Sequence, residues 1–91
     1  MKNYSVEGVK ELPSGRHILV QGGNFTGLNS AKSYAKQLVK DEEAFEAVVL
    51  DNYANDEHAE VIYMVNSEGS FDITAGDLHR VDWADTFGLN Y

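Results

Sequence analysis

The chain contains no cysteine and a single proline, and no apolar run approaches the 18 residues of a membrane helix. A disulfide framework, thiol catalysis and thiolate metal sites are therefore excluded. The first ten residues lack the apolar core of a signal peptide, so we expect a cytoplasmic protein that does not contact a membrane. A hydrophobic fraction of 43% nevertheless predicts a folded core, and the length fits a single domain over residues 1–91.

Basic residues are almost missing from the second half of the chain. Residues 1–40 carry six basic side chains and two carboxylates, a net charge of +4. Residues 41–91 carry thirteen carboxylates and one cation, Arg80, a net charge of −12. Such a half repels phosphate backbones, which disfavours direct nucleic-acid binding, and it attracts proteins with a basic surface. The alternative is that the carboxylates only keep a small domain soluble.

Catalytic motifs are also missing. The chain has no nucleophile elbow, no P-loop and no zinc-protease signature, so we expect no catalytic residue and no enzyme activity. Gly22, Gly23 and Gly27 precede a predicted helix, but they lack the spacing of a dinucleotide-binding loop and a following Lys-Ser/Thr pair. We interpret these glycines as a sharp turn out of the preceding strand.

The polar stretch that begins at Asp51 gathers oxygen and imidazole groups of the kind that bind divalent ions. An EF-hand counted from Asp51 needs glycine at its sixth position and glutamate at its twelfth, where this sequence has Asp56 and Ile62. We therefore expect no metal and no cofactor. The remaining enzymatic alternative is a divalent-metal or histidine-dependent site built from Asp56, His58 and Glu60.

One helix is predicted by the spacing of its apolar residues. Its core-facing stripe consists of Leu28, Ala31, Tyr34, Ala35 and Leu38. A second stripe faces water and consists of Lys32, Lys36 and Lys40. Thr26 is the predicted N-cap, with Asn29 as the alternative. The run of carboxylates that follows predicts an end between residues 40 and 44.

Five segments have the composition of β-strands. Residues 3–12 predict an edge strand, 16–21 and 45–50 predict buried strands, 59–66 predicts a central strand or a partner-facing one, and 70–74 predicts a strand with Phe71 and Ile73 inward and Asp72 outward. The order β-β-α-β-β-β indicates an α+β fold. We expect a small antiparallel sheet, with mixed pairing as the alternative, covered on one face by the single helix.

In the last seventeen residues, the part beyond Leu78 contains the large apolar side chains Val81, Trp83, Phe87 and Leu89, which are too many for a free tail. We expect this segment to fold back over the sheet, and a docking segment is the alternative. Tyr63 and Trp83 can each belong either to the core or to a contact surface.

Aromatic side chains among carboxylates are typical of surfaces that meet a basic partner. The residues that we predict to bind a partner are Asp51, Tyr53, Asp56, Glu57, Glu60, Asp82, Trp83 and Asp85.

The sequence thus favours a small, acidic, non-catalytic protein-binding domain. A concrete version is an inhibitor of a nucleic-acid-binding protein whose carboxylates stand in for phosphates, as in small virus-encoded anti-defence proteins. The alternative is a subunit or regulatory module that associates, as a homodimer or with another subunit, through the apolar strand at residues 61–65 or through the Trp83 tail.

Overall fold

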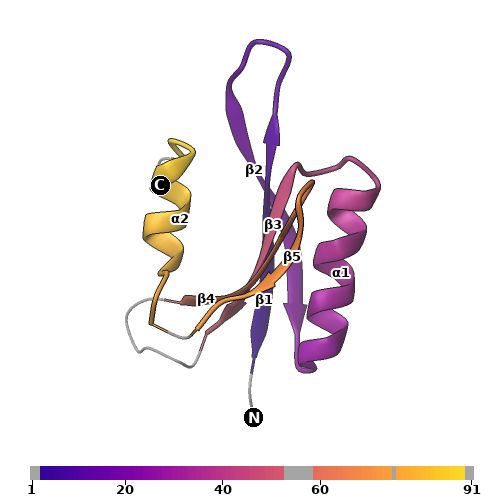
Figure 1. Cartoon of the computed structure of the whole chain (residues 1–91), viewed down its shortest axis with the longest axis vertical. Coiled ribbons are helices and arrows are strands. Elements are labelled where there is room, and N and C mark those ends of the chain that lie inside the picture. The colour runs from indigo at the N-terminus through magenta and orange to yellow at the C-terminus, as the bar shows by residue number, and fades with distance from the viewer. Residues whose placement is uncertain (1–2, 53–58, 75, 90–91) are drawn as a thin grey trace.

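The computed structural model describes residues 3–52, 59–74 and 76–89. In this part of the chain the predicted α+β order is confirmed, and a short second helix follows it (Figure 1). The elements are β1 (Tyr4–Glu11), β2 (His17–Phe25), α1 (Leu28–Lys40), β3 (Glu46–Asp51), β4 (Glu60–Asn66), β5 (Gly69–Asp72) and α2 (Arg80–Thr86).

The strands form one antiparallel sheet in the order β2-β1-β3-β4-β5. Two predicted positions are wrong. Strand β1, predicted at an edge, lies between β2 and β3, whereas β2, predicted to be buried on both sides, is an edge strand. The reason is the path of α1, which carries the chain across β1, so that β3 pairs with the far side of β1 and leaves β2 outside.

The two glycines after residue 21 do not end β2 in a sharp turn, as predicted, but lie within the strand. The register with β1 shifts between Val6 and Glu7, which makes a bulge at Gly22. A Cβ on Gly22 would lie 2.9 Å from a methyl carbon of Val6, and Gly23 has a φ of 103° that glycine adopts without strain. The glycines therefore build the bulge.

Helix α1 covers one face of the sheet with the predicted stripe and ends within the predicted range. Ala31, Ala35 and Leu38 are buried against the sheet, and Tyr34 is 40% exposed because it lies at the border, 5.3 Å from the Phe25 ring. The predicted caps are wrong. Gly27 occupies the N-cap position in an extended conformation and no side chain caps the helix.

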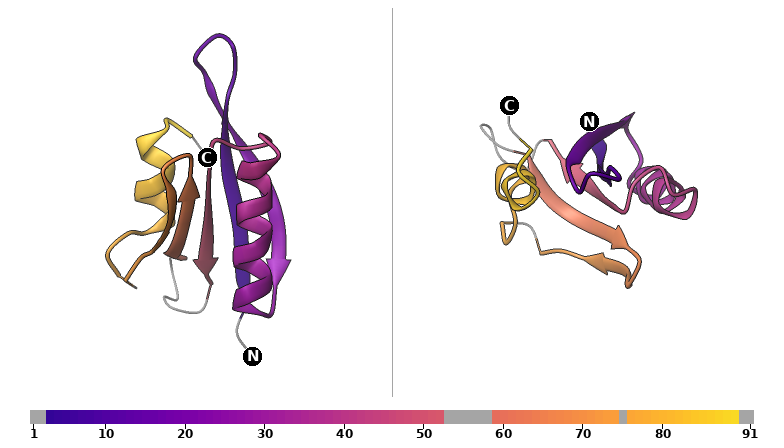
Figure 2. Two further views of the ribbon diagram at one scale, coloured as in Figure 1. Left: turned by 45° about the vertical axis from the view of Figure 1, so that its right-hand side comes forward. Right: turned by 90° about the horizontal axis from the view of Figure 1, so that it is seen from above.

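The other face of the sheet is covered by the C-terminal segment, so the prediction that this segment folds back is confirmed. Figure 2 shows α1 and α2 on opposite sides of the sheet. The sequence predicted a helix on one face and did not specify which face the C-terminal segment covers, so the second core was not anticipated. This second core consists of Val9, Val48, Leu50, Val61, Trp83, Ala84 and Leu89.

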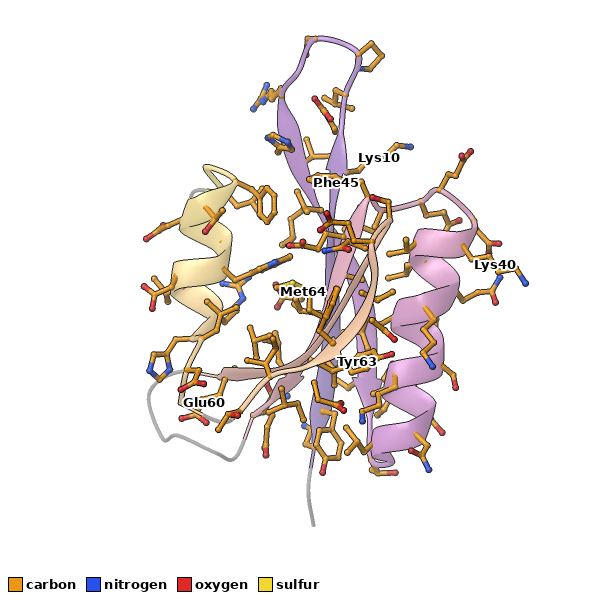
Figure 3. The ribbon with its side chains drawn as sticks, viewed as in Figure 1. Lys10, Lys40, Phe45, Glu60, Tyr63 and Met64 are labelled. Atoms are coloured by element: carbon orange, nitrogen blue, oxygen red, sulfur yellow. The ribbon has the colours of Figure 1, made fainter. Side chains whose placement is uncertain are left out.

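Strand β4 lies inside the sheet, which was one of the two predicted alternatives. It contributes side chains to both cores. Tyr63 belongs to the core under α1, whereas Met64 packs against the core under α2 (Figure 3). On the neighbouring β5 the predicted orientation is wrong for Phe71, whereas Asp72 is exposed as predicted. Phe71 pairs with Met64 at the sheet edge and is 45% exposed, and Asp72 lies on the α1 side, where Lys32 Nζ contacts its carboxylate at 3.1 Å.

The close approach of the α1–β3 connection to β1 gives a testable prediction. A Cβ on Gly8 would lie 2.9 Å from the Ala44 Cβ, closer than two such carbons pack. We expect Gly8→Ala to lower the free energy of unfolding by about 1–3 kcal/mol in urea denaturation, because the added methyl group overlaps Ala44 and one of the two segments must shift. Adding Ala44→Gly should recover part of this loss. An unchanged unfolding midpoint in Gly8→Ala would contradict the contact.

Candidate functional site

Trp83 holds α2 to the sheet. Its side chain is 2% exposed, and its indole Nε1–H donates a hydrogen bond of 2.8 Å to Glu46 Oε2. Glu46 Oε1 accepts a second bond, of 3.1 Å, from Asn66 Nδ2. The buried indole therefore has its polar atom satisfied. Trp83 and Tyr63, for which the sequence left core and surface open, are both core residues.

A second anchor joins the first turn of α2 to β1. Arg80 Nε donates to both carboxylate oxygens of Glu7 at 3.0 Å, and Nη2 donates to Oε1 at 2.8 Å. The two side chains are only 21% and 13% exposed. This fork geometry is the strong form of an Arg–carboxylate pair. The only cation of residues 41–91 is thus directed into the fold and neutralised there.

With Trp83 and Arg80 turned inward, the opposite side of α2 faces solvent. Val81 is 46% exposed, and Asp82 and Asp85 are exposed as well. Residues three and four apart are neighbours on a helix surface, so Asp85 lies next to both Val81 and Asp82. Asp77, in the turn before the helix, is also exposed. We call Asp77, Val81, Asp82 and Asp85 the acidic face of α2.

Two exposed cations lie on the other helix, and two more, Lys10 and Arg16, lie in β1 and in the turn after it. Lys36 and Lys40 are exposed on α1, and Lys32 is paired with Asp72 on that side. The ammonium groups of Lys32 and Lys36 lie 4.9 and 6.0 Å from the centroid of the Tyr63 ring. Because α1 and α2 cover opposite faces (Figure 2), Lys36 and Lys40 lie on the other side of the sheet from Asp82 and Asp85.

The structure divides the predicted partner-binding residues into three groups. Asp82 and Asp85 are exposed and lie together on α2. Asp51, Glu60 and Trp83 are 7%, 8% and 2% exposed, so they are buried in the isolated domain. The first two are buried because they face each other in adjacent strands, β3 and β4, where the sheet ends. Three further residues, Tyr53, Asp56 and Glu57, lie outside the described residues.

Sequence reasoning missed Val81 and Asp77. Val81 was grouped with the apolar residues of the tail, although its spacing from Trp83 places it on another side of a helix. A helical periodicity through residues 80–86 would have separated the inward Trp83 and Ala84 from the outward Val81, Asp82 and Asp85. Seven residues are too few for that periodicity to stand out.

A hollow of about 500 Å³ lies where the β1–β2 hairpin meets the end of α2. It is lined by residues 16–19 and 87–89. Beside it the rings of His17, Phe45 and Phe87 form a cluster with centroids 5.4–5.5 Å apart. Its walls combine polar groups, among them those of Arg16 and His17, with the apolar side chains of Phe87 and Leu89, and it opens beside the first half of β2.

Among residues 3–52, 59–74 and 76–89, no three His, Asp or Glu side chains group as a possible metal site. Two candidates for such a site, Asp56 and His58, lie outside these ranges. Of the two helices described, neither has the length and apolar character needed to span a bilayer. Comparison with known proteins finds no family model, curated protein or solved structure that matches the chain. The candidate surface is therefore argued from geometry and charge.

Two ion pairs among the described residues, Arg80–Glu7 and Lys32–Asp72, allow a matched test of what holds α2. Arg80→Met leaves a carboxylate that is 13% exposed without its fork partner, so we expect a loss of about 1–3 kcal/mol in the free energy of unfolding. Lys32→Met breaks a pair whose Asp72 side chain is 80% exposed, and we expect a loss below about 1 kcal/mol. Chemical denaturation measures both. Equal losses would show that the Glu7 pair does not anchor the helix.

Proposed function

We propose that the chain is a non-catalytic protein-binding domain that acts in the cytoplasm and binds the basic surface of another protein through the acidic face of α2. One observation carries this proposal. The helix presents Asp82 and Asp85 to solvent beside the exposed Val81, while its only cation is neutralised inside by Glu7. The outward charge of the helix is therefore left for a partner.

The acidic face of α2 can bind a partner through both long-range electrostatic attraction and short-range apolar contact. Exposed carboxylates attract a basic partner and raise its association rate. Salt at 0.1 M screens this attraction at separations beyond about 10 Å. Val81 supplies apolar area next to Asp85, as in interfaces where an apolar contact is bordered by polar side chains. Trp83 and Arg80 fix the helix from beneath, so little side-chain or backbone order has to be gained on binding.

The concrete form of the proposal is an inhibitor of a nucleic-acid-binding protein. Carboxylates on a rigid helix are suited to occupy the Lys and Arg side chains that otherwise contact phosphates. The net charge of −12 over residues 41–91 supports this form, because the same charge repels nucleic acid from the inhibitor itself.

The sequence also suggested association through the apolar strand at residues 61–65 or through the Trp83 tail. In the structure β4 lies between β3 and β5, and Val61, Tyr63 and Val65 are buried. Trp83 is buried too. These elements complete the two cores of the domain, so the proposal does not use them.

The test compares the acidic face with carboxylates elsewhere on the surface. We expect Asp82→Asn/Asp85→Asn to reduce capture of the partner from a lysate of the source cells about tenfold at about 0.1 M salt, since two lost contacts of ~0.7 kcal/mol each amount to that factor. The readout is quantitative mass spectrometry of the captured proteins. Capture by the wild type should fall steeply at about 0.5 M salt.

The matched control is Glu42→Gln/Glu43→Gln, which removes the same charge from two exposed residues after α1. It should keep the partner. If both double variants lose the partner equally, net charge and not the acidic face is responsible. For a partner that binds nucleic acid, competition with a DNA duplex decides the inhibitor form: simultaneous binding of the DNA and the domain rules it out.

A further inference from the structure

We propose that β2 pairs with β2 of a second copy of this chain, antiparallel and centred on Leu19, which joins the two sheets into one. This interaction surface is separate from the acidic face of α2. It is inferred from the direction of backbone groups along an edge strand that carries no charged residue between His17 and Phe25.

Printed hydrogen bonds determine which backbone groups of β2 face outward. Val9 O accepts from Phe45 N at 2.9 Å, so Val9 directs its backbone groups toward β3. Leu19, its partner on β2, is therefore in a non-hydrogen-bonded pair and directs its own N–H and C=O away from β1. The hydrogen bond from Leu12 N to Arg16 O agrees with this assignment. It directs the backbone groups of Arg16 toward β1, so those of the next residue, His17, are directed away from β1.

The outward residues before the bulge are thus His17, Leu19 and Gln21. In the described part of the chain, the backbone of β2 is hydrogen-bonded as a strand to β1 alone. An antiparallel pairing about a two-fold axis at Leu19 places Leu19 opposite its own copy and His17 opposite Gln21. All three residues then exchange N–H and C=O bonds with the second copy. The register is self-complementary, as a two-fold interface requires.

Side chains on both faces suit this register. Ile18 is 37% exposed and comes opposite the half-buried Val20 of the second copy, which makes an apolar cross-strand pair. On the other face the two Leu19 side chains meet beside the hollow of about 500 Å³, whose walls include Phe87 and Leu89. The contact thus extends from the strand to the apolar side chains behind it.

The other edge of the sheet is protected. Strand β5 has only four residues and ends in Asp72, and Glu68 precedes it in the turn. Short strands and charged side chains are the usual protection of an edge against pairing. Between His17 and Gln21, β2 has no charge and no proline, and its bulge at Gly22 only limits the length of the pairing.

A second copy is the partner because this is the one long edge where two chains of net charge −8 bring no carboxylates face to face. Five paired residues give an interface below ~1,200 Å², so we expect a dissociation constant on the order of 100 µM. Added salt should strengthen the dimer, because it screens repulsion between the acidic halves. The partner binding proposed above weakens with salt, so the failure of one proposal is distinguishable from that of the other.

The direct test is hydrogen exchange by NMR on the wild-type protein at about 20 µM and about 1 mM. We expect exchange of the Leu19 amide to slow about threefold to fourfold at the higher concentration, because the monomer fraction falls by that factor at a dissociation constant of about 100 µM. The control is Ser70, whose amide also points outward, because Ile73 N bonds to Ile62 O and the alternation along β5 follows. Its exchange should not change. Equal exchange of Leu19 at both concentrations overturns the proposal.

Sedimentation equilibrium of two variants gives an independent test. Ile18→Glu places a carboxylate beside the pairing axis, and we expect it to raise the dissociation constant at least tenfold. Phe71→Glu makes the same change at the exposed apolar residue of β5 and should leave the dimer intact. Thermal melting verifies that both variants are folded. A wild type that stays monomeric at 1 mM, or a dimer lost only in Phe71→Glu, contradicts pairing through β2.

Discussion

Strand β3 is buried on both of its faces, and the remainder of the structure follows from this constraint. Residues 47–50 are at most 1% exposed. A strand of this kind needs a cover on each side of the sheet. The only long helix covers one side, so the C-terminal segment has to cover the other, and the large side chains near its end supply the required volume.

The need to cover the second face of the sheet also determines which charged side chains of α2 are buried and which are exposed. To pack its indole under the sheet, α2 must present a fixed side to the core, and Arg80 next to that side is drawn into the pair with Glu7. The carboxylates of the helix are left on the outside. The acidic face is therefore a consequence of how the second core is closed, and its rigidity comes from Trp83 and the Arg80–Glu7 pair together.

Much of the fold was accessible from local patterns. The spacing from Leu28 to Leu38 predicted α1, and the apolar residues on both faces of β4 predicted either a central strand, as found, or a partner-facing one. The strand order was not accessible, because β1 and β2 differ little in composition and their positions depend on where α1 crosses. Phe71 was placed inward on the pattern of its strand, although an edge strand under a seven-residue helix leaves part of its face open.

The candidate site was predicted only in part, for a related reason. Composition identified Asp82 and Asp85, but burial depends on tertiary contacts that charge patterns do not contain. The sequence placed Asp51 and Glu60 on the surface, but in the structure they are buried where β3 ends and β4 begins. The bulge at Gly22 was likewise taken for a turn, since adjacent glycines serve both purposes.

The central claim is that Trp83 closes a second core and thereby fixes α2. Trp83 is the only tryptophan, so its fluorescence reports on this site alone. The structure predicts blue-shifted emission and weak quenching by acrylamide in the native protein, with both lost in a single transition on unfolding. Emission typical of a solvent-exposed indole, in a protein whose circular dichroism shows the sheet and helix intact, would contradict the account.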